Sequence, residues 1–358
     1  MNIKHPAYLK ALTFPRFLLA SVVVVFHFGL HLTEVETAFL GSFLQHGAVC
    51  VSFFFFLSGM VLSYNYYHKR DITAKQFWLK RIFRIYPLYI ITFGIVLLYQ
   101  LFITDDAPTL LFGFFNLLVL QSWVVGHAME VNFPSWSISV EFFFYFAFPL
   151  LLLLLRKIPY KRFVFLSIIL IVIGWVQHYL FVNYLWEPNR FYVEQFILYF
   201  PPFHFTTFLA GVLCGISLDR LRKLSIHHLV YTLMGGLGIV LFLYIMNTNH
   251  PLRPYGHNGG LIPVFVLICI GLSMDKTFFY RFFGWRPMTY LGEISYGIYM
   301  WQFPVFLTFQ WLFWQEPLTI VHFTIYFLTL VVISSLSYEF IEKPARKKLT
   351  RVIEQKQL

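Results

Sequence analysis

Runs of about 20 apolar residues recur along the whole chain and are separated by short polar loops. A helix of that length crosses the hydrocarbon core of a bilayer, which is roughly 30 Å thick. Lipid cannot satisfy backbone hydrogen-bonding groups, so only helices and closed barrels span it, and runs this long indicate helices. We therefore expect an all-α fold, a polytopic membrane helix bundle of about ten transmembrane helices. The predicted spans are residues 11–32, 46–66, 83–103, 136–155, 163–182, 203–218, 228–246, 259–275, 289–310 and 318–341.

The composition excludes an ordinary soluble domain. Of the 358 residues, 59% are hydrophobic, whereas a soluble domain has about 45–50%. The apolar runs leave no room for a second domain, so we expect one transmembrane domain over residues 1–345 and a short basic cytoplasmic tail over 346–358. The cysteines, Cys50, Cys214 and Cys269, lie inside apolar runs without disulfide or metal-site spacing. We expect them to be packing residues, and we expect no metal.

The net charge of +11 would suggest nucleic-acid binding in a soluble protein, but in a membrane protein it must be read loop by loop. If the N-terminus is cytoplasmic, all of the 27 lysines and arginines except Arg190 and Arg253 lie on or near the cytoplasmic face. The positive-inside rule requires this bias. We therefore expect both termini to be cytoplasmic, and we expect no nucleic-acid partner.

The apolar stretch 109–125 is not counted as a span, because counting it would invert the orientation of every later loop. We expect it to form a re-entrant or interfacial helix. Such a helix is tolerated only where protein or a cavity covers its polar ends.

The first span carries two ionisable residues, Arg16 and His27, which are eleven positions apart. At about 100° per residue this separation is roughly 20° past three full turns, so the two side chains share one helix face. An ionisable residue inside a span costs about 2.5–3.5 kcal/mol and is a functional candidate by default. The structural alternatives are a snorkelling arginine and a histidine satisfied within the core.

Glu141 lies five residues inside the span that begins at residue 136, which is entered from the outer face. His27 lies five residues from the outer end of its own span, so the two side chains are expected at similar depth. A carboxylate beside an imidazole fixes the tautomer of the ring and raises its basicity, as a general base requires. The alternative is that Glu141 only closes an interhelical hydrogen bond.

Arg81 and Arg84 are three residues apart and hence neighbours on a helix at the inner boundary. Two guanidiniums there suit a phosphate-bearing ligand, although ordinary positive-inside anchoring explains them equally well. Glu293, Glu339 and Glu342 near the inner side are able to pair with these arginines and hold the bundle together.

These residues lie in motifs that resemble those of the acyltransferase type-3 family of bacterial membrane proteins, nearly from end to end. Arg16 and His27 match the Arg-x10-His motif of that family. SYGIYMWQFP and YEFIEKPAR resemble its C-terminal pair of motifs. The remaining matches are Gly47, Phe54, Leu57, Ser58 and Gly59 in GAVCVSFFFFLSGMVL, Arg81, Arg84, Tyr86 and Pro87 in RIFRIYPLY, and Trp136 and Glu141 in SWSISVEFFFY.

The resemblance implies a membrane-bound O-acyltransferase of the inner (plasma) membrane. Such an enzyme moves an acyl group, usually acetyl, from cytoplasmic acetyl-CoA or another acyl-CoA to a carbohydrate hydroxyl at the extracytoplasmic face. Direct transfer and a transient acyl-enzyme both fit the residues. The implied site consists of the catalytic His27 as general base, with Arg16 and Glu141 in support, and of the acyl-CoA-binding Arg81, Arg84, Tyr86 and Ser58.

Two departures from the family concern the reaction. Gln302 stands where family members commonly have histidine, and glutamine can only hydrogen-bond. Many relatives also carry a C-terminal extracytoplasmic esterase-like domain, whereas this sequence ends at residue 358 without one. We therefore expect either that the bundle acts alone or that a separate extracytoplasmic transferase or glycan-assembly partner completes the transfer.

The expected partners are the lipid bilayer and a glycan acceptor such as an exopolysaccharide or lipopolysaccharide. A transporter or flippase of glycan or acyl precursors is the main alternative, because buried Arg, His and Glu side chains also form proton relays. A scaffold subunit of a glycan-assembly complex is a third hypothesis. Aromatic residues near the outer boundary either stack on sugars or anchor the interface: Trp123, Trp136, Tyr184, Trp186, Tyr192 and Tyr255.

Overall fold

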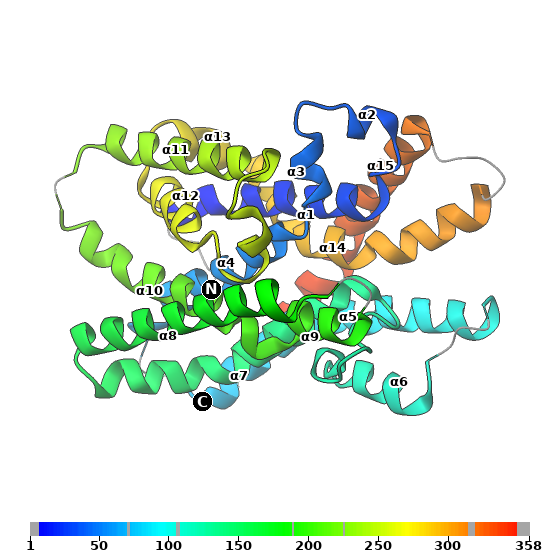
Figure 1. Cartoon of the computed structure of the whole chain (residues 1–358), viewed down its shortest axis with the longest axis horizontal. Helices are drawn as coiled ribbons and strands as arrows, with labels where there is room; N and C mark the ends of the chain where they lie inside the picture. The colour runs from blue at the N-terminus through cyan, green and yellow to red at the C-terminus, as the bar shows by residue number, and fades with distance from the viewer. Residues whose placement is uncertain are drawn as a thin grey trace. The chain divides into compact units, whose positions relative to one another are not determined.

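The structure, a computed structural model, describes residues 7–69, 72–104, 108–187, 190–224, 226–313 and 319–348. The secondary structure of these residues is helical, and no strand occurs among them (Figure 1). Each of the ten predicted spans coincides with a helix, which confirms the all-α membrane bundle. The α-helices are α1 Phe14–Phe28, α2 Thr33–Glu36, α3 Gly41–Gln45, α4 Val49–Tyr66, α5 Ala74–Phe102, α6 Leu110–Leu117, α7 Trp136–Lys157, α8 Tyr160–Leu180, α9 Phe191–Tyr199, α10 Phe205–Leu221, α11 His228–Asn247, α12 Ile262–Met274, α13 Phe278–Phe283, α14 Arg286–Phe313 and α15 Ile320–Ser337.

Eight helices in the described part of the chain are long and apolar enough to cross a membrane. α12 has 13 residues and is therefore about 20 Å long, shorter than a hydrocarbon core. α14 has 28 residues and is not among these eight. α5 has 29 residues and begins at Ala74, well before the predicted span, because Thr73 and Gln76 form a capping box at its start.

The stretch 109–125 forms the short helix α6, which has eight residues and is too short to span. The hydroxyl of Tyr86 donates to the carbonyl of Leu117 at 3.0 Å, and that of Tyr89 donates to the carbonyl of Asn116 at 2.6 Å. These carbonyls belong to the last turn of α6, which lacks partners within the helix. Protein groups therefore cover this polar end, as the prediction of a non-spanning helix requires.

The chain divides into two compact units. Unit 1 consists of residues 1–69, 152–188 and 203–295, and unit 2 consists of the remaining residues. α7 passes from unit 2 into unit 1 after Leu151, and α14 passes from unit 1 into unit 2 after Ser295.

Glycines set the closest helix contacts in unit 1. A Cβ atom at Gly59 of α4 would collide with the carbonyl of Phe208 in α10, and one at Gly211 of α10 would collide with the carbonyl of Phe56 in α4. α11 and α12 lie side by side in the same way, with Gly271 against the backbone of Gly235 (Figure 1). Small residues that let backbones approach are typical of packed membrane helices.

Unit 2 is joined by side chains that donate to the backbone of other helices. The indole of Trp78 in α5 donates to the carbonyl of Tyr145 in α7 at 2.9 Å. The hydroxyl of Tyr296 in α14 donates to the carbonyl of Ile85 in α5 at 2.9 Å. Such bonds satisfy polar groups that lipid cannot satisfy.

The chain continues from α15 through a π-helical turn, Tyr338–Glu342, and stays helical to residue 348. The predicted basic tail, 346–358, therefore begins inside a helix. Residues 349–358 and 1–6 lie outside the described residues. The cytoplasmic placement of both termini stays a prediction.

Candidate functional site

α1 carries both ionisable residues of the first span. The helix is continuous from Phe14 to Phe28, so Arg16 and His27 lie on one face, and both side chains are half-buried. Arg16 lies near the buried Cys269 of α12. His27 lies in the last turn, because the helix ends at the C-cap Gly29 and not at residue 32.

Ser58 lies in α4 next to Gly59, the residue whose missing side chain lets α10 approach. The Ser58 side chain is half-buried. The structure thus explains Gly59 of the motif GAVCVSFFFFLSGMVL by packing. The role of Ser58 in acyl-CoA binding stays a prediction.

A cluster of charged and phenolic side chains lies within unit 2, around Tyr145 of α7. The hydroxyl of Tyr145 donates to Glu141, one helical turn earlier. The guanidinium of Arg81 in α5 lies 5.9 Å from the centre of the Tyr145 ring, and Arg84 also lies near Tyr145. Three predicted site residues, Arg81, Arg84 and Glu141, are thus brought together.

The same cluster extends to the end of the last span. Arg84 interacts electrostatically with Glu342, whose side chain is fully buried, and Arg346 forms an ion pair with Glu342 at 3.0 Å. Lys343 pairs with Glu339 at 2.7 Å. We call Arg81, Arg84, Glu141, Tyr145, Glu342 and Arg346 the Tyr145 cluster.

Two other residues of the family motifs make packing hydrogen bonds. The Tyr86 hydroxyl is engaged with the end of α6, as described above, so acyl-CoA binding by Tyr86 stays a prediction. Gln302 is fully buried, and its side-chain amide donates to the carbonyl of Tyr299 at 2.8 Å. The carbonyl of Gln302 in turn accepts from the hydroxyl of Tyr326 at 2.9 Å.

Arg16, His27 and Ser58 belong to unit 1, whereas Arg81, Arg84, Tyr86 and Glu141 belong to unit 2. The pairing of His27 with Glu141 joins residues of different units and stays a prediction. Sequence reasoning missed Tyr145. It lies four residues after Glu141 and hence on the same helix face, so the spacing could have indicated it.

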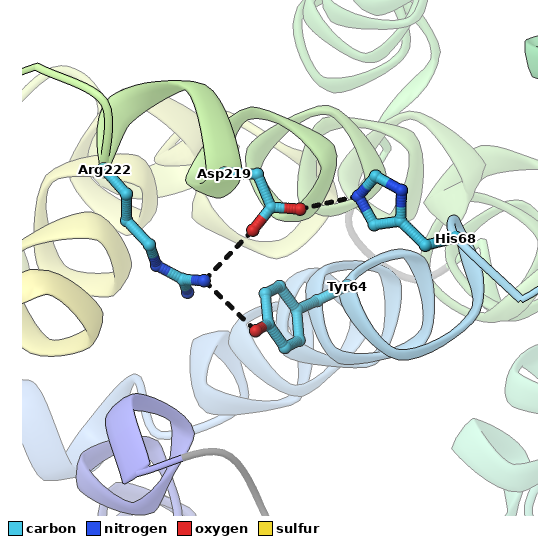
Figure 2. A network of polar contacts seen from close by, with 4 residues as sticks. All are labelled: Tyr64, His68, Asp219 and Arg222. Carbon is cyan, nitrogen blue, oxygen red and sulfur yellow. Dashed lines mark hydrogen bonds and ion pairs between the residues drawn. The ribbon is translucent and has the colours of Figure 1, made fainter.

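A second polar cluster joins the ends of α4 and α10 in unit 1 (Figure 2). His68 contacts Asp219 at 2.7 Å, and Arg222 contacts the same carboxylate at 3.0 Å and the Tyr64 hydroxyl at 3.2 Å. We call these four residues the Asp219 cluster. Most of the His68 side chain, 66%, is exposed.

Asp275 follows the last residue of α12 and is buried. It accepts hydrogen bonds from the Thr232 and Thr277 hydroxyls, both at 2.6 Å, and from the backbone N–H groups of Thr277 and Tyr280 at 3.1 and 3.0 Å. Burial by itself raises the pKa of this carboxyl, but the hydrogen bonds to the ionised form outweigh burial and hold the pKa below its ordinary value. Asp275 ties α11 to the end of α12 and caps the start of α13.

The aromatic residues near the predicted outer boundary differ in exposure. Trp136 is buried against Tyr199, with ring centres 4.7 Å apart, so it is not available to a sugar. Tyr184 and Tyr192 are exposed. Tyr255 is tied to Asn183, whose side-chain amide donates to the Tyr255 hydroxyl at 2.8 Å.

No group of three or more His, Cys, Asp or Glu side chains in the described ranges is arranged to hold a metal ion.

The chain is similar in sequence to several known proteins. Acyltransferase MdmB of Streptomyces mycarofaciens is 40% identical over 137 residues, which is 34% of this chain and 34% of that protein. Peptidoglycan O-acetyltransferase OatA of Listeria monocytogenes is 26% identical over 337 residues, 86% of this chain and 52% of that protein. Putative peptidoglycan O-acetyltransferase YrhL of Bacillus subtilis is 25% identical over 338 residues, 84% of this chain and 50% of that protein.

The chain thus spans about a third of the first relative's length and about half of the other two. No solved structure matches it. The acyltransferase type-3 family model, described as "Acyltransferase domain", matches residues 9–339, which is nearly the whole chain. The chain belongs to the acyltransferase type-3 family.

Proposed function

We propose that the protein is a membrane-bound O-acyltransferase of the inner (plasma) membrane, which moves an acyl group from cytoplasmic acyl-CoA to a carbohydrate hydroxyl at the extracytoplasmic face. The family match over residues 9–339 carries this proposal. Two of the relatives are named as peptidoglycan O-acetyltransferases. Acetyl-CoA and peptidoglycan are therefore the first donor and acceptor to test.

His27 is the general base of the proposed reaction. Its imidazole takes the proton of the sugar hydroxyl, and the oxygen attacks the thioester carbonyl carbon. The carbon–sulfur bond then breaks, and the CoA thiolate takes the proton back from the imidazolium, which leaves an ester and free CoA. Arg16, on the same helix face, polarises the carbonyl oxygen and stabilises the negative charge that develops on it.

The Tyr145 cluster supplies the donor site in this proposal. Its three guanidiniums outnumber its two carboxylates, so the cluster is net positive and attracts the phosphates of CoA. Arg81 and Arg84 bind those phosphates, with Tyr86 and Ser58 as further donor contacts. Glu141 keeps its predicted supporting role in the reaction, and within unit 2 its carboxylate accepts a hydrogen bond from the hydroxyl of Tyr145.

The test uses the full chain in proteoliposomes with labelled acetyl-CoA and peptidoglycan fragments. We expect base-labile ester to form, and we expect His27→Ala and Arg16→Ala to lower its rate by at least about a hundredfold while the protein still inserts. His31→Ala is the matched control, because His31 is exposed and lies beyond the end of α1. Full activity of His27→Ala rejects the mechanism. Glycan transport without ester formation supports the transporter alternative.

The donor site has its own test. Arg81→Ala is expected to weaken CoA binding by about tenfold in a titration and to leave acceptor binding unchanged. The control is Arg281→Ala, which removes an exposed arginine on the predicted cytoplasmic side. Equal CoA affinity in both variants rejects the donor role of Arg81.

A further inference from the structure

The loop between α6 and α7 in unit 2 carries an imidazole–carboxylate pair that the mechanism above does not use. His127 is hydrogen-bonded through Nδ1 to Oε1 of Glu130. The two side chains are 26% and 25% exposed, so they are accessible to a ligand yet held by the surrounding protein. In the predicted orientation this loop lies on the extracytoplasmic side.

Three contacts hold the pair of His127 and Glu130 in place. The ring of Phe112 in α6 stacks on the ring of His127, with centres 3.4 Å apart and 16° between the planes. The side-chain amide of Gln100 in α5 donates to the backbone carbonyl of Glu130 at 2.7 Å. The backbone N–H of His127 donates to the carbonyl of Val124 at 3.1 Å. The ring plane and the position of the carboxylate are therefore set before any ligand binds.

The pair also fixes which nitrogen can act on a ligand. A carboxylate only accepts hydrogen bonds, so in the neutral ring Nδ1 carries the proton and Nε2 carries a lone pair. Within the described residues, no protein group hydrogen-bonds Nε2 of His127. This nitrogen is thus able to accept a hydrogen bond from a hydroxyl.

An exposed aromatic ring lies beside the pair. Gly126 has a φ of +93°, which favours glycine, and the ring of Tyr192 in α9 packs against it. A Cβ atom at Gly126 would lie 2.6 Å from Cε1 of Tyr192. Tyr192 is 65% exposed. The exposed ring of Tyr192 therefore packs against the residue that directly precedes the oriented imidazole of His127.

We propose that His127 and Tyr192 form a carbohydrate-binding subsite for the acceptor. A sugar ring packs on the face of Tyr192, and a sugar hydroxyl donates a hydrogen bond to Nε2 of His127. Glu130 is a positioning residue that acts through His127. A tyrosine that only anchors the membrane interface would not need a stacked imidazole–carboxylate pair beside it. This inference rests on the proposed function, which supplies the glycan.

The test compares variants of the full chain in nanodiscs. Binding of soluble peptidoglycan fragments and of a panel of other oligosaccharides is measured without donor, and the KM values for acceptor and donor are measured with acetyl-CoA. For His127→Ala and for Tyr192→Ala we expect the acceptor Kd and KM to rise about fivefold to tenfold. The donor KM and kcat should stay within about twofold, because neither side chain belongs to the proposed donor site.

The matched controls are His250→Ala and Tyr244→Ala in unit 1. The ring centres of His250 and Tyr244 lie 6.0 Å apart, and His250 accepts from the N–H of Leu252 through Nδ1 at 3.2 Å. This is also a partly exposed histidine–tyrosine pair, but its Nδ1 faces a backbone donor and not a carboxylate. Both control variants should bind glycan as the wild-type protein does.

Glu130 has a separate test because its role is indirect. Glu130→Ala should raise the acceptor KM as His127→Ala does, and the double variant should be no worse than either single one. Glu130→Gln should restore most of the affinity, because the amide oxygen still accepts from Nδ1. Additive losses in the double variant would overturn the positioning role.

The outcomes separate this inference from the proposed function. Unchanged glycan binding by His127→Ala and Tyr192→Ala overturns the subsite, even if the protein transfers acetyl groups. Failure of the wild-type protein to bind any glycan of the panel also overturns it. Binding that both variants weaken supports the subsite, even if no ester forms and the proposed function is wrong.

Discussion

The Tyr145 cluster and the Asp219 cluster use the same kinds of side chain in opposite surroundings. In the first, Tyr145 is 6% exposed and Glu342 is fully buried. In the second, the His68 and Asp219 side chains are 66% and 37% exposed. The carboxylates of the two clusters therefore differ in access to water, since Glu342 is fully buried and Asp219 is 37% exposed, whereas the side chains of their partners Arg346 and Arg222 are 36% and 28% exposed.

Water decides what each cluster contributes. Removing one partner of a buried ion pair leaves an uncompensated charge and typically costs about 3–5 kcal/mol. Removing one partner of an exposed pair costs about 0–1 kcal/mol, because water solvates the remaining charge. Burying an ion pair contributes little net stability, because the desolvation of both charges offsets their attraction. This favours a functional role for the Tyr145 cluster.

The largest effect is expected for Arg346→Ala, which leaves the buried carboxylate of Glu342 with Arg84 alone. We expect a loss of about 3 kcal/mol, the lower end for a buried pair, because Arg84 compensates in part. The control is Lys343→Ala, whose partner Glu339 is 40% exposed at the side chain and whose loss should stay below about 1 kcal/mol. Unfolding of both variants in mixed micelles measures the difference. Equal losses of stability in Arg346→Ala and Lys343→Ala would show that burial of the carboxylate does not matter.

The next prediction asks whether α4 and α10 are held by backbone packing or by the Asp219 cluster at their ends. Gly211→Ala places a Cβ atom against the carbonyl of Phe56, so we expect a loss of about 1–3 kcal/mol. Gly236→Ala is the control, because a Cβ atom there meets nothing within 4 Å and alanine favours a helix by up to about 1 kcal/mol. Thermal unfolding in detergent compares them. If Gly211→Ala leaves the stability unchanged, the Asp219 cluster and not backbone packing holds α4 against α10.

Asp275 is buried like Glu342, but it lies just after the last residue of the helix α12 and therefore at the end of that predicted span. Its folded pKa is lower than the ordinary 3.8, so its contribution to stability is present above pH 3.8 and is lost as the pH falls through the lowered value. Asp275→Asn should therefore destabilise by about 1–2 kcal/mol at neutral pH and by progressively less in acid. Unfolding as a function of pH checks this. A stability loss of Asp275→Asn that grows as the pH falls would contradict the lowered pKa of Asp275.

The helices were predictable because apolar runs of membrane length admit few other structures. The start of α5 was not predictable from the apolar run, because Lys75 and Lys80 interrupt that run. The helix begins earlier because of the capping box at Thr73. α9 was also missed. Its nine residues are too few to span, so it lies within a predicted loop.

The candidate site was predictable only where spacing fixes geometry. Eleven residues in a continuous helix place Arg16 and His27 on one face whatever surrounds them. The expectation that Glu342 pairs with the inner arginines is supported by its electrostatic interaction with Arg84, whereas its ion pair joins it to Arg346, four residues later. The pair of His127 and Glu130 follows no periodic pattern, because it depends on a loop conformation that tertiary contacts determine.

The smallest effect is expected for Asp219→Ala, which removes the carboxylate shared by His68 and Arg222. We expect a loss below about 1 kcal/mol, because water replaces the carboxylate as partner of both side chains. Salt should shrink the loss further, since the Debye length falls to about 3 Å at 1 M ionic strength. Unfolding in detergent at low and at high salt measures both points. A large loss that salt does not change would mean that water is excluded from this cluster too, and the contrast with the Tyr145 cluster would then have to rest on something other than solvation.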